Sequence, residues 1–152
     1  MMMKQTTVTI LCFCSVLFAS AQTSTMEIST SQLVGTKWER VLPEDKGVSI
    51  FAMFTKTSLN ENIYYELIAK SHSISNDYYI TDEPPSYSLF HADYVGKDRK
   101  GHYIVFYYPI DKEVDYWKVV SATDDELLFF RKAKPGQIPN LDIYIKYKRI
   151  KE

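Results

Sequence analysis

The sequence predicts an all-β protein: an antiparallel up-and-down meander of eight or nine strands that closes into a small barrel. Three observations support this fold class. Aromatic and β-branched residues gather in short runs separated by turn residues, which is the pattern of strands. The connections between the runs are short, as in a meander. No run of ten or more residues has helical periodicity.

The chain is expected to begin with a secretory signal peptide, residues 1–21. One cation, Lys4, precedes an apolar stretch over residues 8–18, and the small residues Ala19-Ser20-Ala21 follow, as at a signal cleavage site. The alternative is a membrane anchor, but the apolar stretch is well short of the roughly 20 residues that a spanning helix needs. We therefore expect an exported protein, periplasmic or extracellular, with no membrane span after cleavage.

Cleavage would change the composition of the chain. Both cysteines, Cys12 and Cys14, would leave with the signal peptide, which excludes disulfides, a cysteine nucleophile and cysteine-ligated zinc. Loss of Lys4 leaves 17 cations and 19 anions, a net charge near −2. This charge balance argues against nucleic acid as a partner.

The expected elements follow one another with short connections. Residues 22–34 are mostly Ser, Thr and Gln and predict a flexible lead-in, with a short helical turn at 31–33. The barrel domain is expected to span residues 35–152. Its expected strands are 36–41, 48–55, 62–70, 77–81, 87–95, 102–108, 114–122, 126–133 and 141–150.

Period-two alternation predicts a sheet with one covered face. In the last run, Leu141, Ile143, Ile145 and Tyr147 share one face, while charged residues and Tyr144 occupy the other. Two architectures fit such strands, a closed barrel and a sandwich. The short connections favour the barrel, because a Greek-key sandwich needs a long crossover.

Three segments resemble the bacterial lipocalin-like proteins, small secreted members of the calycin group. "LVGTKWERV" resembles the opening strand of that family, where a Gly shortly precedes a Trp, although the spacing here is one residue longer than the usual Gly-x-Trp. "WKVVSATDDELLFFRK" resembles the late hairpin with its acidic turn, and "LDIYIKYKRI" resembles the closing strand. The similarity covers most of the mature chain.

The resemblance implies architectural roles for four residues. Gly35 and Trp38 would open the barrel, Asp124 would belong to the hairpin turn, and Arg149 would pack across the indole of Trp38. Trp38 is then a buried plug at the closed end. Such barrels often bind a small apolar molecule, and many bacterial members have no assigned ligand. As interior ligand contacts we predict Tyr65, Leu67, Phe106 and Tyr116.

No residue pattern predicts an enzyme, a cofactor or a metal site. The histidines His72, His91 and His102 lack the i, i+2 or i, i+4 spacing that aims two imidazoles at one metal ion. Adjacent carboxylates stand beside predicted turns, where they usually cap backbone N–H groups or remain solvated. No serine has a G-x-S-x-G sequence around it.

Two functions from different classes remain open. The first is a secreted carrier of a small apolar or amphipathic ligand in the barrel. The second is an extracytoplasmic module that binds a protein or glycan through exposed aromatic residues and has a filled barrel. The many bulky rings slightly favour a filled interior.

Overall fold

The computed structural model describes residues 26–44, 47–134, 136 and 142–151. The expected signal peptide, residues 1–21, lies outside the described residues. Eight antiparallel strands form a closed barrel in the order β10-β2-β3-β4-β5-β7-β8-β9, which confirms the predicted fold class. Within the described part of the chain, no helix is long and apolar enough to cross a membrane.

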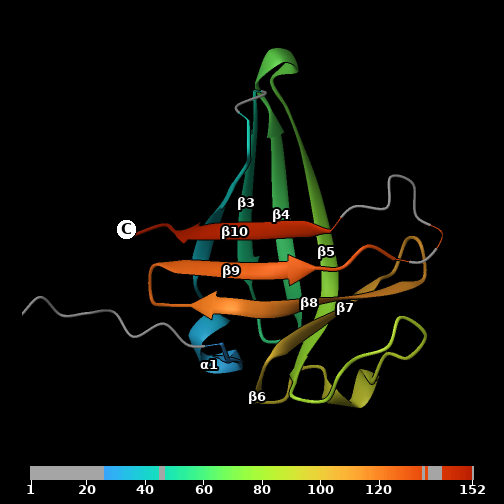
Figure 1. The fold of residues 1–152 in the computed structure, drawn as a ribbon. Helices are drawn as coiled ribbons and strands as arrows, with labels where there is room; N and C mark the ends of the chain where they lie inside the picture. The colour runs from blue at the N-terminus through green and yellow to red at the C-terminus, as the bar shows by residue number, and fades with distance from the viewer. Residues whose placement is uncertain (1–25, 45–46, 135, 137–141, 152) are drawn as a thin grey trace, which may run out of the picture.

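The barrel follows the chain from strand to strand, as expected for a meander (Figure 1). Among the described strands, β1 and β6 do not belong to the barrel and pair with each other in a separate two-stranded sheet. The barrel strands are β2 (Lys37–Val41), β3 (Val48–Phe54), β4 (Ser58–Tyr65), β5 (Lys70–Thr81), β7 (Tyr103–Tyr108), β8 (Glu113–Ala122), β9 (Glu126–Arg131) and β10 (Ile143–Arg149). The small sheet consists of β1 (Ile28–Ser29) and β6 (Lys100–Gly101). Short helical turns are α1 (Thr30–Leu33), η1 (Glu66–Ile68) and η2 (Ala92–Tyr94).

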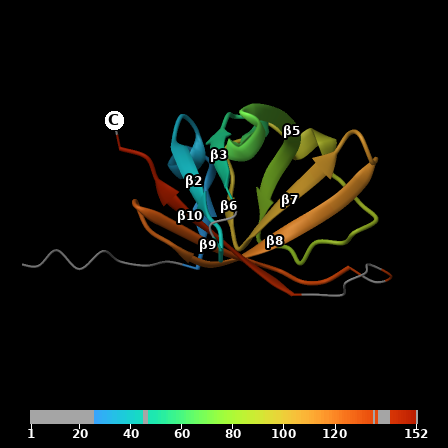
Figure 2. The ribbon, with the colours of Figure 1, turned by 90° about the horizontal axis from the view of Figure 1, so that it is seen from above.

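The two ends of the barrel differ. The helix α1 lies at one end, and β3, β4 and β5 run past β10 at the other, where η1 joins β4 to β5 (Figure 1). Viewed from above, β2 and β3 lie across the barrel from β7 and β8 (Figure 2). We call the α1 side the closed end and the η1 side the wide end.

Three expected elements differ from the structure. The helical turn expected at 31–33 is confirmed by α1, but the lead-in around it, expected to be flexible, also forms β1, and Ile28 and Leu33 are fully buried. The predicted strand 62–70 is interrupted by η1, after which the chain turns back as the long strand β5. The predicted strand 87–95 is a loop containing η2, because its aromatic residues pack against the outside of the sheet instead of joining the ladder.

Aromatic side chains fill the middle of the barrel. Trp117 packs on Phe106 with 4.5 Å between ring centroids, and Phe129 and Tyr147 lie against the same indole. Together with Trp38, Phe54 and Tyr78, these rings belong to one buried cluster. The filled interior is therefore the centre of the barrel, and any polar chemistry must lie nearer its ends.

Candidate functional site

Polar side chains occupy the inward face of the barrel between the aromatic cluster and the wide end. Because side chains alternate along a strand, Arg40 points to the same side of β2 as the buried Trp38, and Glu61 points to the same side of β4 as the buried Leu59. The register pairs Arg40 with Tyr147 across β2 and β10. We define the inner polar layer by its six residues: Arg40, Glu61, Tyr108, Asp115, Arg131 and Tyr147.

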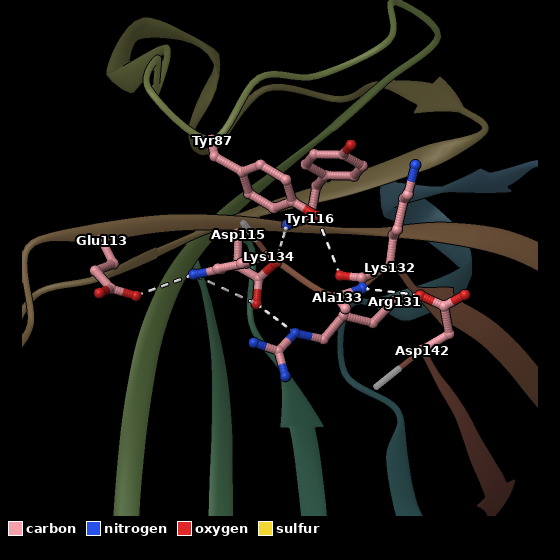
Figure 3. Close-up of polar contacts among 9 residues, drawn as sticks. All are labelled: Tyr87, Glu113, Asp115, Tyr116, Arg131, Lys132, Ala133, Lys134 and Asp142. Carbon is pink, nitrogen blue, oxygen red and sulfur yellow. Dashed lines mark hydrogen bonds and ion pairs between the residues drawn. The ribbon is translucent and has the colours of Figure 1, made fainter. Parts of the chain in front are cut away.

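Asp115 is the most buried charged group of this layer, with 0 % of its surface exposed. Its Oδ2 accepts a hydrogen bond from Arg131 Nε at 2.6 Å, and its Oδ1 accepts one from the backbone N–H of Tyr116 at 2.8 Å (Figure 3). Lys134 Nζ lies 3.8 Å from Oδ2 and 3.0 Å from Glu113 Oε2. Two cations therefore compensate the desolvation of one buried carboxylate.

The two tyrosines of the layer are held as neutral phenols. Burial raises the pKa of Tyr147 well above 10.0, and the negative charge of Glu61 adds to the shift. The Tyr147 hydroxyl donates to Glu61 Oε1 at 2.7 Å. Burial likewise raises the pKa of Tyr108, whose ring is nearly parallel to that of Phe106. Both hydroxyls remain hydrogen-bond donors at neutral pH.

Arg40 differs from the other charged groups of the layer. It is half-buried. Its positive charge lowers the pKa of both Tyr108 and Tyr147, against the larger effect of burial, which raises them. Within the described residues it forms no hydrogen bond or ion pair, and the Tyr108 hydroxyl forms no hydrogen bond either. The layer thus contains a guanidinium and a phenol that can still donate.

An apolar surface continues from the layer toward the wide end. The β3–β4 register pairs Ile50 with Ile63 on the inward face, and both are half-buried. Val48 and Ile74, on β3 and β5, are half-buried on the same face. A pocket of about 370 Å³ at the rim contains Arg40 and Val48 in its wall. Glu39, Glu44 and Glu66 line the same pocket, so cationic, anionic and apolar groups meet at the wide end.

The structure separates the four predicted ligand contacts. Phe106 is fully buried below the polar layer, and Tyr65 ends the inward row of β4 with its side chain partly exposed. Leu67 lies in η1 with 92 % of its surface exposed, because the alternation of β4 stops before it. Tyr116 lies outside the barrel, where its ring stacks on that of Tyr87 with 4.7 Å between the ring centroids. Leu67 and Tyr116 therefore do not line the interior.

The four residues with predicted architectural roles meet at the closed end. Trp38 is 1 % exposed, and its Nε1 donates to Thr36 Oγ1 at 2.7 Å. Arg149 is the register partner of Trp38, and its Nη1 donates to the carbonyl oxygen of Asp124 at 3.3 Å. With Gly35, which adopts a φ of 78°, these residues border one pocket of about 400 Å³.

Many outward-facing aromatics are covered by the chain itself. Phe90 lies 5.2 Å from Tyr79 and 5.4 Å from Tyr107 between ring centroids, so the loop before η2 packs on β5 and β7. Tyr94 also packs on Tyr79, and the guanidinium of Arg99 lies over the Tyr94 ring at 3.9 Å. The segment 87–95, expected to be a strand, therefore covers part of the outer aromatic surface that a partner-binding module would use.

The polar layer was not predicted from the sequence. Asp115 stands within the apolar run 114–122 and Arg131 near the end of the run 126–133, and each is a charge at an inward position of a strand. A charge within an otherwise apolar run is a sequence signal for this site, but the run alone does not show which of its faces is inward.

Comparison of the chain with protein-family models, with curated proteins and with solved structures finds no match. The eight-stranded antiparallel barrel is compatible with a lipocalin-like fold.

Proposed function

We propose that this protein is an exported, lipocalin-like barrel that binds a small amphipathic molecule with an anionic group at its wide end. The observation that carries the proposal is the half-buried Arg40, which has no hydrogen-bond or ion-pair partner among the described residues. Removing a cation partly from water costs free energy unless an anion or a hydrogen-bond acceptor compensates it. A bound carboxylate would supply both.

The neighbouring charges support an anionic ligand. Asp115 is already engaged by Arg131 and Lys134, and Glu61 accepts the Tyr147 hydroxyl. Arg40 therefore remains available to an incoming acceptor, with the Tyr108 phenol as a second donor. Arg is well suited to this role because its guanidinium can make two parallel hydrogen bonds to one carboxylate.

The apolar surface beside the layer accounts for the remainder of the ligand. Val48, Ile50, Ile63 and Ile74 are only half-buried on the inward face. Covering them with an alkyl chain would add a favourable contribution of roughly 25 cal/mol for each Å² of apolar surface removed from water. The filled aromatic centre limits the ligand to the wide end of the barrel.

A ligand series tests the proposal. Sodium laurate, dodecanol and dodecyltrimethylammonium have the same chain length and differ in head-group charge; each is titrated below its aggregation concentration by isothermal calorimetry. We expect laurate to bind most tightly. Arg40→Met should weaken laurate binding at least about tenfold, because a hydrogen bond to a charged group contributes about 1.5–3 kcal/mol.

Lys118→Met is the matched control, because Lys118 is exposed on the outer face of β8. It removes one cation and should leave laurate affinity unchanged. Equal laurate affinity in the wild type and Arg40→Met, or no laurate binding at all, would contradict the proposal.

One observation favours a partner-binding module as the second candidate. Leu67 and Ile68 of η1 are 92 % and 61 % exposed, and Tyr64 and Tyr65 precede them with partly exposed rings. Exposed apolar groups of this size often mark a contact surface. The double variant Leu67→Ser/Ile68→Ser separates the two functions. It should leave laurate binding intact. If η1 is a docking surface, the variant should change the self-association of the protein, which light scattering measures.

A further inference from the structure

Three side chains of types that can ligate a metal ion, Glu27, Asp82 and His102, lie close together beside the small sheet and outside the inner polar layer. The β1–β6 register pairs Ile28 with Gly101, and one residue further it places Glu27 opposite His102. The β5–β7 register pairs Thr81 with Tyr103, which brings Asp82 opposite the same histidine. Three segments far apart in the sequence thus contribute one side chain each.

Gly101 permits this close arrangement. A Cβ built on Gly101 would overlap the carbonyl group of Thr81, so only glycine allows β6 to lie this close to the end of β5. The backbone therefore holds His102 beside Asp82 before any ligand binds.

The distances fit an imidazole that is oriented by one carboxylate and faces another. Asp82 Oδ1 lies 2.6 Å from His102 Nδ1, a hydrogen-bond distance. Glu27 Oε1 lies 3.8 Å from His102 Nε2, which is longer than a hydrogen bond. The separation of 3.8 Å between these two atoms is similar to that between two ligand atoms that each lie about 2.0–2.2 Å from the same Zn²⁺ ion. All three side chains are solvent-accessible, so an ion can reach them.

We propose that Glu27, Asp82 and His102 form a binding site for a divalent transition-metal ion of the zinc class. His102 Nε2 and Glu27 Oε1 are the direct ligands, and Asp82 accepts the Nδ1–H and orients the ring. A carboxylate on the second nitrogen of a metal-binding histidine is the usual arrangement. Water completes the coordination, and the nitrogen ligand favours zinc over Mg²⁺ and Ca²⁺.

Lys100 provides a way to distinguish a metal site from a purely structural ion pair. Its Nζ contacts Glu27 Oε2, on the same carboxylate that faces His102. As a neighbouring cation, Lys100 repels a second positive charge at Glu27. Removing it should therefore strengthen metal binding, whereas it would only weaken a structural cluster.

The test is a calorimetric titration of the protein, free of any affinity tag, with ZnCl₂ in a non-chelating buffer. We expect one zinc ion to bind. His102→Ala should reduce the affinity at least tenfold, and Asp82→Asn by roughly 10–100-fold, as loss of an orienting partner does. Lys100→Met should increase it several-fold. MgCl₂ at the same concentrations should give no heat of binding.

His72→Ala is the matched control, because His72 is an exposed histidine of β5 outside the cluster. It should bind zinc as the wild type does, and circular dichroism should show that every variant is folded. A zinc-induced rise of the unfolding temperature in the wild type, absent in His102→Ala, gives an independent readout. No zinc binding by the wild type, equal affinity in His102→Ala, or weaker binding in Lys100→Met overturns the proposal.

Discussion

Arg131 Nε donates to Asp115 Oδ2 at 2.6 Å inside the barrel, where the carboxylate has no exposure to solvent. Removing Arg131 takes away the nearer of two cations and leaves the buried carboxylate with Lys134 alone, whose Nζ lies 3.8 Å from Oδ2. Breaking a buried pair in this way costs more than the pair itself contributes. We expect Arg131→Met to lower the free energy of unfolding by about 3–5 kcal/mol. Urea denaturation measures this change.

The exposed Lys118 again provides the control for that prediction. Lys118→Met should change the free energy of unfolding by no more than about 0.5 kcal/mol, as surface substitutions usually do. The double variant Asp115→Asn/Arg131→Met should be more stable than Arg131→Met alone, because it no longer buries a charge. Equal stability of Arg131→Met and Lys118→Met would show that the buried pair has no such role.

Local pattern predicted the barrel but not the polar layer, for a physical reason. Alternation in the last strand correctly indicated that Ile145 and Tyr147 face the core, and both are buried. The inward position of Asp115 depends on the register of β8 with β7, which pairs it with the buried Phe106. Register arises from contacts between strands, and a single run of sequence does not determine it.

The aromatic loop shows a second limit of local pattern. The run 87–95 has the composition of a strand, yet it forms a loop in which the rings of Phe90 and Tyr94 pack on Tyr79 from outside the sheet. The cluster of Glu27, Asp82 and His102 was missed for a related reason: the spacing of histidines cannot reveal ligands that come together across strands.

The two tryptophans should respond differently to loss of the indole N–H. Trp38 Nε1 donates to Thr36 Oγ1, whereas Trp117 Nε1 is the one buried side-chain nitrogen or oxygen without a partner in the described part of the chain. Trp38→Phe should therefore destabilise the protein by about 1–3 kcal/mol more than Trp117→Phe, because the former breaks a buried hydrogen bond.

Chemical denaturation of the two phenylalanine variants tests this difference. Trp38→Ala should cost roughly 3–5 kcal/mol, as large truncations in a core do. A larger loss of stability in Trp117→Phe than in Trp38→Phe would mean that the packing of the central ring outweighs the hydrogen bond at the closed end.

Gly101→Ala should destabilise the barrel through steric overlap. The new methyl group would meet the backbone of Thr81, which cannot move away without disturbing the ladder. Overpacking of this kind typically costs about 1–3 kcal/mol. Lys100→Ala changes the neighbouring exposed position without adding a clash and is the comparison. Thermal unfolding of both variants measures the effect, and equal midpoints would contradict it.

Stability should fall in alkaline solution because buried tyrosines resist ionisation. Burial raises the pKa of Tyr78 to about 12 and that of Tyr147 well above 10.0. In the unfolded chain both phenols titrate near pH 10, so above this pH the unfolded state holds fewer protons than the folded state. The stability that these phenols contribute is complete below pH 10 and is lost as the pH rises through the folded-state pKa values.

Tyr147→Phe should make this pH dependence shallower, because it removes one such group. Tyr144→Phe is the matched control: Tyr144 lies three positions earlier on the same strand and is 66 % exposed. Free energies of unfolding measured in urea at a series of alkaline pH values give the slope for each protein. The loss of the Tyr147 hydrogen bond to Glu61 lowers stability already at neutral pH, so the slope, and not the neutral value, is diagnostic. The same change of slope in Tyr144→Phe would contradict the assignment to the buried ring.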